Sequence, residues 1–342
     1  MGVTAVHVAM SHTRYVSVNT SRLRRFGAAF ALLALAALVA ALVPAPASAA
    51  IALSGNENGG TISLIDTTTD TVVGEIKTGG KPRGIAVDQR RRLAYVSDQP
   101  NNALLVVDID HRTVVRKVEL GESPEGVYIS PDGTLVATSV ELSNSVVFID
   151  TATDKIAFRV KIKGENPEHS VFSPDGRFVY VSAEEDDKLE VIDVAARSLV
   201  TQVKIGLRPR GIAFTPDGAK AYVACERANT VYVFDARTHT ITGTIKAGLR
   251  ANGLTMQPDG KRVFLSNGGD GNVMIIDTSN DTVLATVAVG KRPWNMAVTA
   301  DGAKLYVANG RSNSVSVIDL KSNSPLKEIP VGETPWGVAI LN

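Results

Sequence analysis

Short apolar segments recur along most of the chain, each bounded by residues that favour turns. Within residues 209–247, such segments begin in order at Ile212, Ala221, Val231 and Ile241. The first two are separated by Pro216-Asp217-Gly218, in which Pro presets φ and Gly accepts a positive φ. β-Branched and aromatic residues dominate the segments, and no stretch shows a convincing 3.6-residue period. This pattern predicts four strands joined by turns.

The four-segment pattern repeats seven times. Each G-x-x-P segment, in one of which Ala251 replaces Pro, opens with a Gly, at Gly79, Gly121, Gly164, Gly206, Gly248, Gly290 and Gly332. Each V-x-V-I-D-like run ends with an Asp, at Asp66, Asp108, Asp150, Asp193, Asp235, Asp277 and Asp319. Both markers advance by 42 or 43 residues, and four strands in that length make one propeller blade. We therefore predict an all-β, seven-bladed β-propeller of four-stranded blades.

The two ends of the repeat region predict how the ring closes. Residues 51–54 match the second strand of a blade, whereas residues 337–341 match the first strand. We expect the C-terminal strand to complete the blade begun by the N-terminal residues, which joins the last blade to the first through backbone hydrogen bonds.

Residues 1–49 differ from the repeats and contain no Asp or Glu. Arg22, Arg24 and Arg25 precede an unbroken apolar run from Phe26 to Val43, and small residues follow at Ala47 and Ala49. This order is typical of a secretory signal peptide, so we expect cleavage after Ala49. A retained membrane anchor is the alternative, since the run approaches the length of a bilayer span. The predicted domains are a signal peptide over 1–49 and a propeller over 50–342. We expect the propeller to be periplasmic or secreted and to have no membrane span after cleavage.

Charge gives little reason to expect a polyanionic partner. Removal of residues 1–49 takes away four arginines and no acidic residue, which leaves 32 basic against 35 acidic residues. A near-neutral domain has no bulk electrostatic attraction to nucleic acid. Cys225 is the single cysteine, so an intramolecular disulfide is excluded, and we expect a buried thiol on a strand.

The residue after the opening Pro of each repeat is the main candidate for binding. We expect it to face the mouth of the central channel, and across the seven repeats it is Arg83, Glu125, Glu168, Arg210, Asn252, Trp294 and Trp336. The next position is Gly except at His169 and Asn295, and we expect these glycines to permit close backbone approach at the axis. A mouth lined with convergent polar groups is the default ligand site. The alternative is a solvated rim that tolerates any polar residue.

Charges near the mouth predict two sectors. Glu122, Glu125, Glu141, Glu165, Glu168 and residues 184–187 fall on neighbouring repeats, whereas Arg208, Arg210, Arg227, Arg250, Lys291 and Arg292 fall on the following ones. Such a bipolar face suits a charged protein partner. We expect Arg83, Arg210, Arg250 and Arg292 to pair with carboxylates and Glu125 and Glu168 with cationic groups, while Trp294 and Trp336 supply apolar area.

The sequence lacks the residues and motifs that several kinds of metal-binding and catalytic site require. His111 and His239 follow the Asp marker on the face opposite His169, so they cannot form one metal centre with it. The chain has no C-x-x-C-H, G-x-S-x-G, P-loop or H-E-x-x-H motif. The seven marker Asp residues are expected to be structural, because a catalytic Asp needs no seven copies. We therefore predict no metal, no cofactor and no catalytic residue.

The repeats resemble the YVTN family of β-propeller repeats over residues 51–342. The resemblance is carried by P-x-G-I-A-x-x-P-D-G, by V-x-V-I-D and by a Y-V-x-N strand, as in Tyr306-Val307-Ala308-Asn309. Residues 124–126, 130–133, 148–153, 292–294 and 335–338 are similar to the subgroup associated with pyrroloquinoline-quinone-dependent alcohol catabolism. This resemblance implies a bacterial, exported accessory protein that works beside quinoprotein dehydrogenases. It supplies no catalytic residues to transfer.

These observations favour a non-enzymatic binding protein that docks a partner protein or a small anionic ligand at the channel face. The implied partner is a quinoprotein dehydrogenase or its cytochrome. One alternative is an enzyme such as a propeller lactonase, with Glu168, His169 and Arg210 as acid–base candidates. Another is a cell-surface or single-stranded nucleic-acid binder that uses Arg and Trp, which the net charge disfavours.

Overall fold

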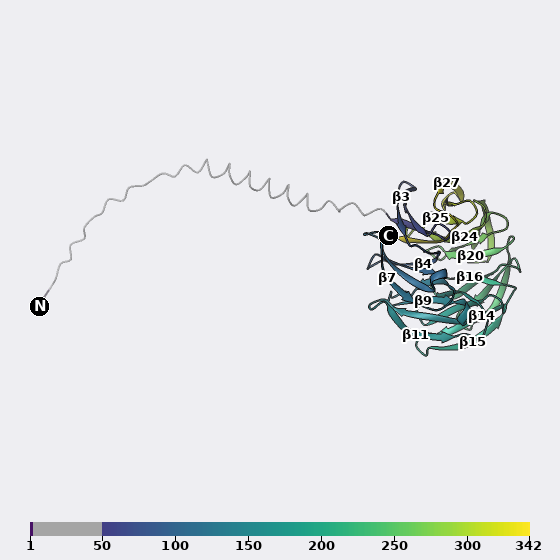
Figure 1. The fold of residues 1–342 in the computed structure, drawn as a ribbon, viewed down its shortest axis with the longest axis horizontal. Helices are drawn as coiled ribbons and strands as arrows, with labels where there is room; N and C mark the ends of the chain where they lie inside the picture. The colour runs from purple at the N-terminus through teal and green to yellow at the C-terminus, as the bar shows by residue number, and fades with distance from the viewer. Residues whose placement is uncertain (3–49) are drawn as a thin grey trace. The chain divides into compact units, whose positions relative to one another are not determined.

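The computed structural model describes residues 1–2 and 50–342, so the predicted signal peptide lies outside the described residues. Residues 50–342 form seven four-stranded antiparallel sheets arranged as the blades of a propeller (Figure 1). Six blades are formed by strands consecutive in the chain, and the seventh by β28, β1, β2 and β3. The structure confirms the predicted all-β, seven-bladed propeller. Within the described residues, no helix has the length and apolar character needed to traverse a bilayer.

In six blades the strands run in sequence order from the channel outward, and in the seventh β28 is innermost and is followed by β1, β2 and β3. The innermost strands are β4 (Pro82–Asp88), β8 (Pro124–Ile129), β12 (Pro167–Phe172), β16 (Pro209–Phe214), β20 (Ala251–Met256), β24 (Pro293–Val298) and β28 (Pro335–Leu341). The second strands are β1 (Ile51–Asn56), β5 (Leu93–Asp98), β9 (Leu135–Val140), β13 (Phe178–Ala183), β17 (Lys220–Cys225), β21 (Arg262–Asn267) and β25 (Lys304–Asn309).

The outer half of each blade completes the sheet. The third strands are β2 (Thr61–Asp66), β6 (Ala103–Asp108), β10 (Ser145–Asp150), β14 (Lys188–Asp193), β18 (Thr230–Asp235), β22 (Asn272–Asp277) and β26 (Ser314–Asp319). The outermost strands are β3 (Thr71–Lys77), β7 (Thr113–Glu119), β11 (Lys155–Lys161), β15 (Ser198–Lys204), β19 (Thr240–Lys246), β23 (Thr282–Ala288) and β27 (Ser324–Pro330). Two 3₁₀ turns follow second strands, η1 (Gln99–Asn101) and η2 (Glu141–Ser143).

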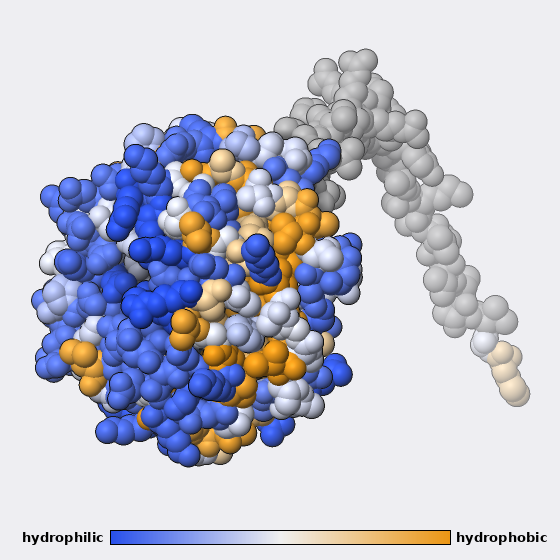
Figure 2. Space-filling model, turned by 90° about the vertical axis from the view of Figure 1, so that its right-hand side faces the viewer, coloured by the Kyte–Doolittle hydropathy of each residue, from blue (hydrophilic) through white to orange (hydrophobic). Residues whose placement is uncertain are grey.

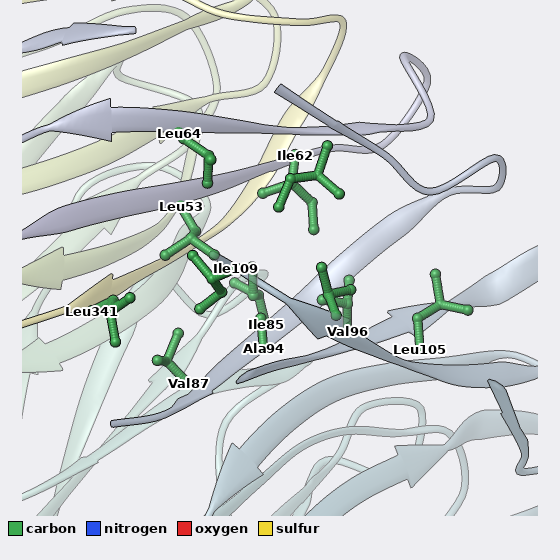
Figure 3. Close-up of a cluster of buried hydrophobic side chains, with 12 residues drawn as sticks. Leu53, Ile62, Leu64, Ile85, Val87, Ala94, Val96, Leu105, Ile109 and Leu341 are labelled. Atoms are coloured by element: carbon green, nitrogen blue, oxygen red, sulfur yellow. The ribbon is translucent and has the colours of Figure 1, made fainter. Parts of the chain in front are cut away.

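The core lies between blades. One apolar cluster joins Leu53 and Leu341 of the seventh blade to Ile85 and Val96 of the first, and these side chains point toward one another in Figure 3. The second and third strands are buried on both faces, which explains their continuous apolar runs, whereas the outermost strands are mostly exposed. Accordingly, the face drawn in Figure 2 is largely hydrophilic, with apolar residues in separate patches.

The marker Asp residues close the turn after each third strand. Asp66 Oδ1, for example, accepts the backbone N–H groups of Thr68 at 2.7 Å and Thr69 at 3.0 Å. Equivalent bonds to following backbone N–H groups are made by Asp108, Asp150, Asp193, Asp235, Asp277 and Asp319. These carboxylates satisfy turn backbone groups, which confirms the predicted structural role.

Glycines bring the innermost strands together. A Cβ atom built at Gly84 would lie within 3 Å of the carbonyl oxygen of Glu125, and one at Gly337 within 3 Å of that of Arg83. The same holds for Gly126, Gly211 and Gly253 against the next strand. The predicted close approach at the axis is therefore confirmed.

Ring closure occurs as predicted. β28 pairs with β1 in antiparallel register, from Ile51 opposite Leu341 to Gly55 opposite Gly337. A side-chain contact reinforces the seam from the neighbouring blade, since the hydroxyl of Tyr306 donates to Asp70 and Lys304 Nζ lies 2.7 Å from Asp70 Oδ2. Tyr222 makes the equivalent bond to Asp281 at 2.6 Å between the fourth and fifth blades.

We expect Tyr306→Phe to lower the free energy of unfolding by about 1–3 kcal/mol, because it leaves the buried Asp70 carboxylate short of a donor. Tyr222→Phe is the matched control, since it removes the same bond away from the seam. Urea denaturation measures both. Equal losses would mean that the Tyr306–Asp70 bond stabilises only its own pair of blades, whereas a larger loss for Tyr306→Phe would show that it also holds the ring closed.

Candidate ligand site at the channel mouth

Two positions per blade supply side chains to one end of the channel. The first is the second residue of each innermost strand, which follows Pro in six blades and Ala251 in β20. The second is the residue that directly follows each second strand, namely Glu57, Gln99, Glu141, Glu184, Glu226, Gly268 and Gly310. Backbone bonds hold the second position against the loop that leads into the first, because Glu184 N–H donates to Asn166 O at 3.0 Å and Glu226 N–H to Arg208 O at 2.8 Å.

Arg210 lies at the centre of a buried ion-pair network. Its Nη1 contacts Glu168 Oε1 and lies 3.0 Å from Glu184 Oε2, and its Nε donates to Glu226 Oε2 at 3.1 Å. The arginine side chain is 11% exposed, and those of the three glutamates are 2–6% exposed. One guanidinium therefore links carboxylates from two blades in a site largely closed to water.

Glu226 is shared by three arginines. Besides Arg210, Arg292 Nη2 donates to Glu226 Oε1 at 2.8 Å, and Arg208 Nε lies 3.3 Å from Oε2. Arg208 also contacts Glu184. The sequence predicted separate acidic and basic sectors. Ion pairs join the two predicted sets where the third blade meets the fourth, because Arg208 and Arg210 contact Glu184 there.

Small residues make room for the large side chains on the basic side. A Cβ atom at Gly268 would lie 2.9 Å from Arg292 Nη1, and one at Gly310 would overlap the ring of Trp294. The Arg292 guanidinium in turn lies over Trp294, with its carbon 5.8 Å from the ring centroid. The absence of a side chain after β21 and β25 thus admits Arg292 and Trp294 to the mouth.

Two of the arginines have an unusual backbone. Arg208 and Arg292 have φ values of 60° and 55°, in the left-handed region, and each precedes a proline. Ser123, Asn166, Arg250 and Thr334 occupy the same position with similar φ values. The conformation therefore belongs to the turn that leads into the innermost strand, and it sets the direction from which Arg208 and Arg292 enter the site.

A second group brings together side chains from the innermost strands of four blades. Arg83 contacts Glu125, and its guanidinium carbon lies 5.0 Å from the centroid of the Trp336 ring. Trp336 is only 4% exposed and stacks on His169 with ring centroids 5.9 Å apart and planes at 13°. The Tyr128 hydroxyl contacts His169 Nδ1, and the innermost strands line a cavity of about 110 Å³ that Tyr128 and Trp336 border.

Burial and mutual repulsion separate the pKa values of the glutamates. Burial and the neighbouring Glu168 raise the pKa of Glu184 to about 8 and raise that of Glu125 well above its usual range. Burial would also raise the pKa of Glu168, but Arg210 and Arg83 outweigh it and hold that pKa at about 2. Burial lowers the pKa of His169 to about 4, so the ring is neutral at pH 7. Perturbed pairs of this kind are concentrated at functional sites.

The raised pKa of Glu184 predicts a pH dependence of stability. Between about pH 4.5 and 8 the folded state holds a proton at Glu184 that the unfolded chain releases, so this group's stabilisation falls as pH rises. Glu184→Gln stays neutral throughout. We expect the melting temperature of the wild type, relative to this variant, to fall steadily across the window and to level off above it. The exposed neighbour Glu185→Gln serves as control, and a constant wild-type offset from Glu184→Gln would contradict the assignment.

The candidate residues do not all lie in one cluster. Arg83, Glu125, His169 and Trp336 form one group, whereas Glu168, Arg208, Arg210 and Arg292 meet around Glu184 and Glu226, with Trp294 beside Arg292. Asn252 is buried on β20, and Arg250 is exposed. Sequence reasoning missed the hub role of Glu226, although Glu at the position after the second strand in four of the seven repeats was a usable signal.

Residues 169–330 match a family model described as "Lactonase, 7-bladed beta-propeller". A hydrazine synthase chain of Kuenenia stuttgartiensis superposes with a TM-score of 0.71 at 22% identity over 77% of this chain and 90% of that one. A protein of unknown function from Desulfotomaculum acetoxidans superposes at 0.76 with 17% identity over 85% and 99%. At these identities the likeness concerns the fold alone. The search of curated proteins found no match.

Proposed function

We propose that this propeller is a non-enzymatic binding protein that holds a small carboxylate-bearing molecule at the channel mouth. The supporting observation is that Arg208, Arg210 and Arg292 converge on one carboxylate, that of Glu226. Guanidinium groups recognise carboxylates through paired, charge-assisted hydrogen bonds. Their partial burial, with Arg210 and Arg292 side chains 11% exposed, strengthens such bonds by excluding water.

Thermal stabilisation by defined ligands tests this proposal. Purified residues 50–342 are heated with succinate, citrate, glycolate or uncharged glycerol, each over a range of concentrations. We expect a concentration-dependent rise in melting temperature with at least one carboxylate but not with glycerol, because ligands that bind only the folded state stabilise it. Arg292→Met should abolish the rise, whereas Arg311→Met, at an exposed arginine, should retain it. Absence of any rise across the acids would contradict the proposal.

The proposal includes an accessory role beside a quinoprotein dehydrogenase or its cytochrome, in the periplasm or outside the cell. That part rests on the resemblance of the repeats to the subgroup associated with quinone-dependent alcohol oxidation. Purified residues 50–342, immobilised and exposed to periplasmic extract, should retain such a dehydrogenase or cytochrome, identified by mass spectrometry. Its absence from the eluate would remove the accessory role and leave the small-ligand proposal standing.

A lactone-converting enzyme is the second candidate function. The match of residues 169–330 to the lactonase family model favours it, as does the split between Glu168 and Glu184, two neighbouring carboxyl groups with pKa values of about 2 and about 8. A protonated Glu184 could donate to the ring oxygen that leaves as the ester bond breaks. Hydrolysis of simple γ- and δ-lactones, followed by proton release, tests it. Turnover that Glu184→Gln abolishes would favour the enzyme over the binding protein.

A further inference from the structure

The carboxylate of Glu226 occupies the place that an anionic ligand would need. Its two oxygens contact Arg208, Arg210 and Arg292, and the residue is 5% exposed. Arg208 and Arg210 enter from the loop before β16 and from β16 itself, whereas Arg292 enters from the loop before β24. Three cationic groups from two separate segments therefore share one internal carboxylate.

The negative charge of Glu226 does not balance the positive charges of the arginines around it. Arg208 and Arg210 also contact Glu184, which is neutral at pH 7, so three guanidinium charges face the two ionised carboxylates of Glu168 and Glu226. In addition, Arg292 Nη1 is buried and has no hydrogen-bond partner among the described residues. Excess positive charge and an unused donor both favour an additional anionic group at this place.

Glu226 directly follows a strand, so release of its carboxylate requires no strand to move. It is the first residue after β17, at the start of a turn that leads to β18, and Arg227 beside it is exposed. Its backbone N–H is fixed by Arg208 O, so only the side chain must rotate to free the arginines. Rotation of one side chain is a small rearrangement compared with movement of a strand.

We infer that Glu226 is an internal competitor that holds the arginine site until a ligand carboxylate displaces it. The inference rests on the proposed binding function. It adds the position of the ligand and a minimum affinity that a ligand must have to displace Glu226. A ligand must interact with the three arginines more favourably than the Glu226 carboxylate already does. Molecules with two or three carboxylates satisfy this condition better than monocarboxylates, because the additional groups can use the excess charge and the free Nη1 donor.

The inference predicts that removal of the Glu226 charge increases affinity. We expect Glu226→Gln to bind citrate and succinate at least tenfold more tightly than the wild type in isothermal titration at pH 7. Glu328→Gln, which removes a carboxylate from the exposed strand β27, is the matched control and should bind like the wild type. Glu226→Asp keeps the charge on a shorter side chain and should bind with intermediate affinity, so it provides the answer if Glu226→Gln does not fold.

The outcomes separate the two proposals. Binding by the wild type with equal or weaker binding by the folded Glu226 variants would overturn the competitor role and leave the binding function intact. Binding by no folded protein at millimolar citrate or succinate would overturn both. Tighter binding by Glu226→Gln than by Glu328→Gln and the wild type supports both.

Discussion

Arg210→Met is expected to lower the free energy of unfolding by about 3–5 kcal/mol, because it leaves carboxylates buried without their shared cation. Glu168, Glu184 and Glu226 all contact the guanidinium of Arg210, and Met can replace only its aliphatic part. The ionised carboxylates of Glu168 and Glu226 would then take up a proton or draw in water, and either response weakens the folded state.

Urea denaturation at pH 7 measures this loss. Arg227→Met is the matched control, since Arg227 is exposed in the turn after β17, and its replacement should change the free energy of unfolding by no more than about 0.5 kcal/mol. Combining Arg210→Met with Glu226→Gln should cost less than the sum of the two separate losses, because the residues contact each other. An unchanged denaturation midpoint for Arg210→Met would show that the network contributes nothing to folding.

Gly337→Ala is expected to destabilise the propeller by about 2–3 kcal/mol. The added methyl would lie within 3 Å of the carbonyl oxygen of Arg83, and neither backbone can retreat without spreading the innermost strands. Gly243→Ala, on the outermost strand β19, is the control, because a Cβ atom there has open space. Alanine at that position should be neutral or slightly stabilising, since it reduces the freedom of the unfolded chain. Similar melting temperatures for the two variants would contradict the close packing of the innermost strands at the axis.

The fold could be predicted from the sequence because the features that specify it lie within one repeat and recur in the others. Strand, turn and period are visible within a single repeat, and the seam follows from the unmatched strands at residues 51–54 and 337–341. The position of Arg210 at the start of an innermost strand was equally predictable, since it follows Pro209. Its partners were not, because contact between Arg210 and Glu226 depends on the rotation between strands and on side-chain direction. The pairing of Arg292 with Glu226 depends further on the space that Gly268 leaves, which involves three separate repeats.

The seam between β1 and β28 also predicts an order of folding. Six blades are hairpins of neighbouring segments and can form from local contacts, whereas Ile51 must find Leu341 across the whole repeat region. Contacts so distant in sequence are expected to form late, because closing a long loop loses conformational entropy before the hydrogen bonds of the new strand pair can form. Until then β1 presents an unpaired edge that fits the β28 of another molecule as well as its own. Refolding at high concentration should therefore yield strand-exchanged dimers, and dilution should favour the monomer.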